Sequence, residues 1–192
     1  MNRRKALVRI GLGGAGLVAF FAGYEFYSLE KSPDVDYVLR NKALLAALAE
    51  RIIPATPGVP GATEAGVADF IIMMIRECTP RMEQNQFIKG LKDLQSYSHS
   101  QCDRLFQECT PQQQEKILTR FEAKDRRLPG IAGKVEGRLM GRPFFSILKA
   151  YTVEGYCTSE AGATRGLSYV QIPGSFKGCI PLAAGQRAWA TN

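Results

Sequence analysis

Apolar residues recur at helical spacing along most of this 192-residue chain, and that spacing is its strongest structural constraint. In the clearest case, Val67, Phe70, Ile71, Met74 and Ile75 occupy positions i, i+3, i+4, i+7 and i+8, which share one face of a helix. Similar stripes are Leu44, Leu45, Leu48 and Ile52; Phe87, Ile88, Leu91 and Leu94; Leu105 and Phe106; Ile117, Leu118 and Phe121; and Phe144, Phe145, Leu148 and Tyr151. The stripes predict an all-α protein, a small helical bundle of about five to six helices over residues 41–155.

The ends of several helices are marked by residues that stop or cap them. Pro54 ends the first helix, and Pro143 begins the last one. Thr110 is an N-cap followed by Pro111 in the first turn, and Gln113 completes a capping box with it. Residues 55–66 are expected to form a loop, and residues 124–142 a basic, glycine-rich connection.

The N-terminus has the pattern of an export signal. Residues 1–9 hold four cations and no acid, and the uncharged stretch 10–24 follows. The pair Arg3 and Arg4, with Leu7 three residues later, resembles a twin-arginine signal. The stretch 10–29 approaches the length of a bilayer-spanning helix, so an uncleaved membrane anchor is an open alternative. We therefore assign residues 1–27 to a twin-arginine-type signal or N-terminal anchor helix and residues 28–40 to a linker.

The C-terminal part loses helical periodicity. Glycines and prolines interrupt the chain from Gly155 onward, and aromatic and aliphatic residues lie between them. An irregular run of this length in a compact domain is usually a binding segment or disordered. This one is too apolar for a free tail, so residues 156–192 are expected to be an irregular segment that docks on a partner.

The residues that catalysis needs are scarce. His99 is the single histidine, and it lies in a polar stretch. Its spacing from Cys102 and Cys109 does not match a zinc site, and no haem-attachment, nucleophile-elbow or phosphate-loop motif occurs. We predict no catalytic, cofactor-binding or metal-binding residue in this chain.

The basic charge does not point to nucleic acid. The formal charge is +7, but residues 1–27 supply four cations and one acid, which leaves +4 for the rest. The remaining basic cluster lies in the 124–142 connection, where a solvated surface explains it: Lys124, Arg126, Arg127, Lys134, Arg138 and Arg142. No nucleic-acid partner is expected.

The five cysteines are an odd number, so at least one thiol is free or bonded to another chain. Beyond an export signal disulfides are permitted. Cys157 and Cys179 bracket much of the irregular segment and are candidates for a disulfide with each other. A bond from either of them to a partner subunit is an equally good candidate.

Several blocks of sequence resemble the gluconate 2-dehydrogenase subunit 3 family. They are residues 44–56 (LLAALAERIIPAT), residues 66–70 (GVADF), Phe144 with Phe145, residues 154–164 (EGYCTSEAGAT), residues 169–174 (YVQIPG) and residues 177–182 (KGCIPL). The resemblance covers about residues 41–182, and its end blocks are the most specific. Cys157 departs from the family pattern, which usually has an aromatic residue there.

The resemblance implies a non-catalytic small (gamma-type) subunit of a periplasmic, membrane-associated, flavin-dependent sugar or sugar-acid dehydrogenase. The large partner would be a flavoprotein of the glucose–methanol–choline type that carries FAD, and a multihaem cytochrome c subunit with haem c often takes the electrons. The small subunit would support export, folding and stability of the flavin subunit. The alternative is a membrane-tethered periplasmic assembly or interaction protein unrelated to dehydrogenases.

The residues expected to touch the partner lie in the two end blocks of the resemblance. They are Tyr156, Thr158, Ser159, Glu160, Tyr169, Pro173, Gly174, Gly178, Cys179 and Pro181.

A twin-arginine signal on this chain predicts that a large subunit without its own signal is exported with it. Replacing Arg3 and Arg4 by lysine is expected to leave both subunits in the cytoplasm, as cell fractionation and immunoblotting would show. Normal export of the large subunit in the double variant would contradict the prediction.

Overall fold

A computed structural model describes residues 31–125 and 141–190, the second range without residues 171, 173, 176, 177, 180 and 183. The elements are α2 (Val35–Arg40), α3 (Lys42–Ile52), α4 (Val67–Met73), the π-helix η1 (Met74–Cys78), α5 (Arg81–Cys102), the 3-10 helix η2 (Phe106–Glu108), α6 (Pro111–Lys124), α8 (Phe144–Thr158) and the π-helix η3 (Gly162–Gly166). Within these residues there are six α-helices and no β-strand, only two isolated bridges, so the predicted all-α class is confirmed. The proposed signal or anchor helix, with Arg3 and Arg4, lies outside the described residues.

Local sequence signals set several helix ends as expected. The Thr110 Oγ1 accepts a hydrogen bond from the Gln113 amide, and the Thr110 amide donates to the Gln113 side chain, which confirms the capping box of α6. Ile52 ends α3 two residues before Pro54, and Pro143 is the N-cap of α8.

Part of the expected linker is helical. Residues 35–40 form α2, which begins where the Asp34 carboxylate accepts a hydrogen bond from the Tyr37 amide at 3.1 Å. Val38 is buried and belongs to the core, so this short helix packs on the bundle instead of merely leading to it.

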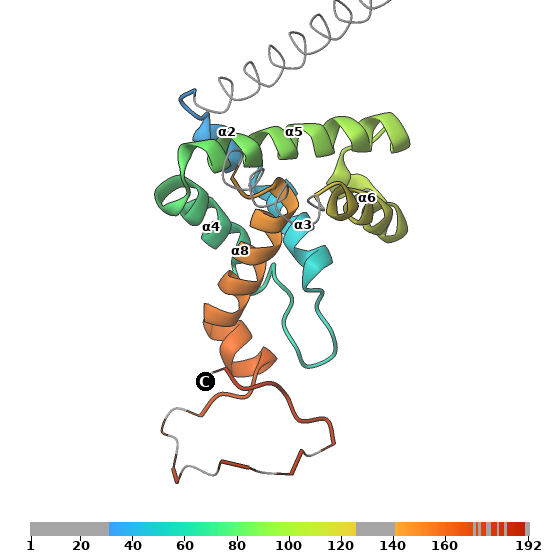
Figure 1. Cartoon of the computed structure of the whole chain (residues 1–192). Coiled ribbons are helices and arrows are strands. Elements are labelled where there is room, and N and C mark those ends of the chain that lie inside the picture. The colour runs from blue at the N-terminus through green and yellow to red at the C-terminus, as the bar shows by residue number, and fades with distance from the viewer. Residues whose placement is uncertain are drawn as a thin grey trace, which may run out of the picture.

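The bundle is built around α8. This helix runs through the middle of the molecule, α5 lies across one of its ends, and α3, α4 and α6 also contact it (Figure 1). Phe144, in its first turn, packs between two aromatic rings, with centroid distances of 5.3 Å to Phe87 and 6.1 Å to Phe121. The predicted apolar stripes supply most of the core, although Phe70 and Met74 are only partly buried and Leu105 is exposed.

The last helix extends beyond its expected end. Gly155 was expected to mark the loss of helical structure, but α8 continues to Thr158 and a π-helical turn follows at 162–166. Gly155 is buried inside the helix because the ring of Phe70 lies against it, and a Cβ there would come within 2.7 Å of Phe70 Cδ1. This glycine allows α4 and α8 to approach closely and does not interrupt the helix.

None of the helices in the described part of the chain has both the length and the apolar content needed to span a bilayer.

Gly90 allows α5 to approach Phe144 closely, and this contact can be tested. A Cβ at position 90 would overlap the Phe144 side chain. We expect Gly90→Ala to lower the free energy of unfolding by about 2 kcal/mol, because overpacking outweighs the gain in helix propensity. Chemical denaturation would measure this, with the exposed Ser96→Ala on the same helix as a control that changes stability by less than about 0.5 kcal/mol. Equal stability of the two variants would contradict the close packing.

Candidate functional site

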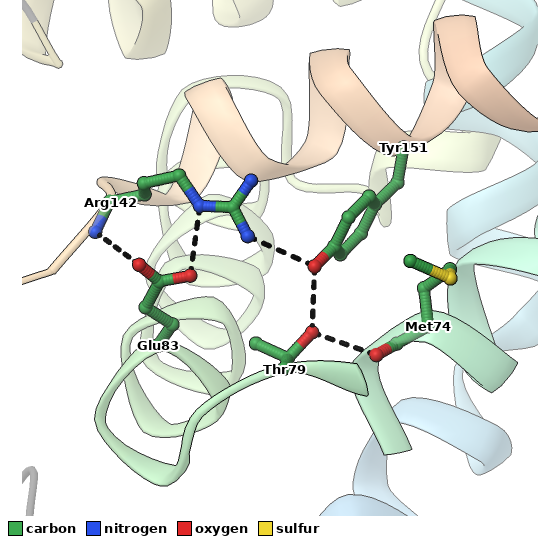
Figure 2. Close-up of polar contacts among 5 residues, drawn as sticks. All are labelled: Met74, Thr79, Glu83, Arg142 and Tyr151. Atoms are coloured by element: carbon green, nitrogen blue, oxygen red, sulfur yellow. Dashed lines mark hydrogen bonds and ion pairs between the residues drawn. The ribbon is translucent and has the colours of Figure 1, made fainter. Parts of the chain in front are cut away.

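A chain of polar side chains joins η1, α5 and α8, and we call it the polar junction: Thr79, Glu83, Arg142 and Tyr151, with the backbone carbonyl of Met74 (Figure 2). The Glu83 carboxylate accepts from the Arg142 amide and from its Nε, both at 2.9 Å. The Arg142 Nη2 donates to the Tyr151 hydroxyl at 3.0 Å. The same hydroxyl lies 2.9 Å from Thr79 Oγ1. Thr79 Oγ1 donates in turn to the Met74 carbonyl at 2.8 Å.

The direction of these hydrogen bonds follows from the number of protons. Thr79 has a single hydroxyl proton and gives it to the Met74 carbonyl, so the Tyr151 hydroxyl must donate to Thr79. Tyr151 then accepts from Arg142 and donates to Thr79. Burial lowers the pKa of Arg142, but the hydrogen bonds to Tyr151 and Glu83 and the charge of Glu83 outweigh it, so the net pKa of Arg142 is raised.

The polar junction fixes the position of α8. Arg142 lies two residues before this helix and connects it to Glu83 on α5, while Tyr151 connects its middle to the end of η1. In the described residues no buried side-chain nitrogen or oxygen lacks a hydrogen-bond partner. The side chains of the junction are bonded to one another, and together they connect η1, α5 and α8.

A second connection holds the other end of α8. The Tyr156 hydroxyl donates to the Pro60 carbonyl at 2.8 Å, in the loop that follows α3. Glu50 on α3 holds that loop by accepting from the amides of Ala55 and Thr63, at 2.9 and 2.8 Å. Partial burial raises the pKa of Glu50, but the two backbone hydrogen bonds outweigh it and the net pKa is lowered.

Beyond this connection the chain forms a loop closed at its base, which we call the C-terminal loop (residues 167–190). The Ser168 amide donates to the Ala188 carbonyl, and the Ala190 amide donates to the Ser168 carbonyl, both at 2.8 Å. The loop extends from the end of α8 that lies away from α5 (Figure 1).

Large apolar side chains on the C-terminal loop are exposed. The exposed fractions are 48% for Tyr169, 42% for Val170, 83% for Ile172, 84% for Leu182 and 47% for Trp189. Five large apolar side chains of this loop are therefore open to solvent.

The comparison with known proteins identifies the family. The family model of gluconate 2-dehydrogenase subunit 3 matches residues 40–174. The chain belongs to this family. No curated protein and no solved structure matches it. The matched range covers nearly all of the bundle and the first part of the C-terminal loop, so the resemblance to this family is confirmed over residues 40–174.

Tyr156 is not placed to touch a partner. It was expected among the partner-binding residues, but its side chain is buried at 6% exposure and bonded to Pro60. Burial also raises the pKa of its hydroxyl. In this family member it is a core residue, because α8 continues past Gly155 and turns position 156 inward.

The other expected partner-binding residues differ in position. Thr158 and Glu160 are exposed near the end of α8, whereas Ser159 is half-buried and its Oγ accepts from the Gly162 amide at 2.9 Å. Ser159 and Glu160 line an open groove that the 2.6 Å ion pair between Glu64 and Arg165 borders. On the C-terminal loop the expected residues Tyr169, Gly174, Gly178, Cys179 and Pro181 are exposed, and Pro173 lies outside the described residues.

The expected disulfide between Cys157 and Cys179 is absent. All five cysteines lie in the described residues and all are free thiols. Cys157 is half-buried on α8, whereas Cys179 is exposed on the loop. The two backbone hydrogen bonds between Ser168 and the 188–190 segment close the loop instead.

Sequence reasoning missed Trp189. It is the single tryptophan of the chain, about half exposed, and it pairs with Ser168 where the loop closes. The sequence did contain a signal for this residue, because a lone tryptophan in an aperiodic segment is typical of an interaction surface.

The described part of the chain contains no group of three or more histidine, cysteine or acidic residues that could hold a metal ion. His99 is exposed, with its Nε2 3.8 Å from an Asp103 oxygen.

The polar junction predicts a cost for removing one hydroxyl. Tyr151→Phe keeps the ring but leaves a donor of Arg142 and an acceptor of Thr79 without their partner, so we expect the free energy of unfolding to fall by about 1–2 kcal/mol. Denaturant titration would measure it. Tyr169→Phe, at an exposed position, is the matched control and should change stability by less than about 0.5 kcal/mol. Equal effects of the two substitutions would contradict the role of the junction.

Proposed function

We propose that this chain is a non-catalytic small subunit of a flavin-dependent sugar or sugar-acid dehydrogenase, and that it binds the flavin subunit through its C-terminal loop. Membership of the family makes the chain a subunit of a dehydrogenase complex. The proposal adds that the partner is a large subunit of the glucose–methanol–choline type carrying FAD. A multihaem cytochrome c subunit with haem c accepts the electrons.

The observation that carries the docking proposal is the exposure of apolar side chains on the C-terminal loop. Ile172 and Leu182 are both more than four-fifths exposed, on a loop whose base is fixed by backbone hydrogen bonds. Removing apolar surface from water stabilises a complex by about 25 cal/mol per Å² before the costs of association. A loop held at its base reduces those costs because part of the chain is already ordered.

The bundle and the loop have separate roles in this proposal. The bundle buries its own core and needs no partner for that, whereas the loop presents apolar groups outward. The chain would stabilise the flavin subunit by covering a matching apolar surface on it.

Export is the second part of the proposal. Arg3 and Arg4 start a twin-arginine signal that carries the folded complex to the periplasm, where residues 1–27 either anchor it to the inner membrane or are removed. The support is the charge and hydropathy pattern of residues 1–24.

Truncation after Leu167 tests docking. The cut spares Tyr156 and its bond to Pro60, so the bundle should keep its helical circular dichroism and its Tm within a few degrees. We expect co-purification with the flavin subunit to fall at least tenfold.

Point variants sharpen this test without shortening the chain. Changing Ile172, Leu182 and Trp189 to serine should reproduce the loss of co-purification. Changing Leu39 and Leu105, which are exposed by 53% and 43% elsewhere on the bundle, to serine is the matched control and should leave co-purification intact. Retained co-purification of the loop variant would refute docking through this loop.

A further inference from the structure

The turn between α5 and α6 brings two cysteines together. Cys102 is the last residue of α5, and Cys109 directly follows η2, seven positions later. Cys109 is buried in the core, and Cys102 is half-buried against the same core. Burial and the neighbouring Cys109 thiol raise the pKa of the Cys102 thiol.

The surrounding groups explain why the thiols meet. Ser98 lies one helical turn before Cys102 on the same face of α5, and its Oγ is 3.2 Å from the Cys109 Sγ. Ser98 Oγ also donates to the Arg104 carbonyl at 3.1 Å, which folds the turn back on the helix. Asp103 ends α5 in a left-handed conformation, with φ of 52°.

The far side of the turn is fixed as well. Phe106 is fully buried, its amide donates to Gln95 Oε1 at 3.2 Å, and its carbonyl accepts from Gln114 at 2.9 Å. The position of Cys109 is therefore set by α5 and α6 together, and its placement beside Ser98, one turn from Cys102, is a property of the folded bundle.

We propose that Cys102 and Cys109 form a disulfide that closes the turn between α5 and α6 when the folded chain meets a disulfide oxidant. The inference goes beyond the proposed function and stands whether or not the chain binds a flavin subunit. Export would bring the chain into an oxidising compartment, where such a bond persists.

The reaction is a thiol–disulfide exchange with a protein disulfide or a small-molecule disulfide as oxidant. The more accessible Cys102 loses its proton, and its thiolate attacks the oxidant and forms a mixed disulfide while one thiol of the oxidant leaves. Cys109 then loses its proton and attacks the Cys102 sulfur, and the second thiol leaves. The two cysteines lose two electrons and two protons, and the oxidant gains both.

A disulfide between this pair also changes the number of thiols that remain in the chain. Oxidation uses two of the five thiols and leaves Cys78, Cys157 and Cys179. An odd number of thiols therefore remains outside the α5–α6 turn, so at least one of the three is free or bonded to another chain.

Peptide mapping tests the proposal directly, because trypsin places each cysteine on a different peptide. The full chain, purified under reducing conditions, is treated with oxidised glutathione at mildly alkaline pH, alkylated and digested. We expect peptide 93–104 to be linked to peptide 105–116, and the number of alkylated cysteines to fall from five to three.

Thermal unfolding gives a second readout. Closing an eight-residue loop by a disulfide is expected to raise Tm by about 5 °C relative to the reduced chain. Cys102→Ser should abolish both the link and the rise, and Cys179→Ser, the control at an exposed cysteine, should keep both. Absence of the 93–104 to 105–116 link in the oxidised chain would overturn the proposal, as would a linked chain that unfolds at the same temperature as the reduced one.

Discussion

The fold depends on the burial of α8 among the other helices. Its first turn inserts Phe144 between Phe87 and Phe121, and this contact requires that Gly90 on α5 carry no side chain. Because α3, α4, α5 and α6 all contact α8, any shift of this helix would disturb the whole core. Close packing of this kind stabilises a bundle but does not by itself fix the rotation or the axial position of a helix.

Hydrogen bonds supply that specificity at both ends of α8. The polar junction ties Arg142 and Tyr151 to α5 and η1, and Tyr156 ties the other end to the loop after α3. The Asp125 carboxylate, at the end of α6, also accepts from the first amides of α8. These bonds have directions and lengths, so they permit one placement of the helix where apolar contacts alone would tolerate several.

A fixed α8 gives the C-terminal loop a fixed starting point. The loop begins where η3 ends and closes on itself through Ser168, so its exposed apolar side chains extend from a base that backbone hydrogen bonds hold together. Under the proposed function, this arrangement separates the part that folds from the part that binds. The turn that carries Cys102 and Cys109 joins α5 to α6, within the part that folds.

The sequence by itself determined the elements whose causes are local. Helical spacing of apolar residues predicted the helices, Thr110 with Gln113 predicted the start of α6, and the end blocks predicted the family. These signals are local because a helix and its caps depend on residues within a few positions of one another.

Only the tertiary structure decided the rest. Gly155 looked like a helix breaker until Phe70 was seen packed on it, and Tyr156 looked like a surface residue until α8 turned it toward Pro60. Cysteine placement was decided in the same way: the packing of α5 and α6 sets Cys109 against Ser98, one helical turn from Cys102, whereas Cys157 and Cys179 are free thiols on α8 and on the C-terminal loop.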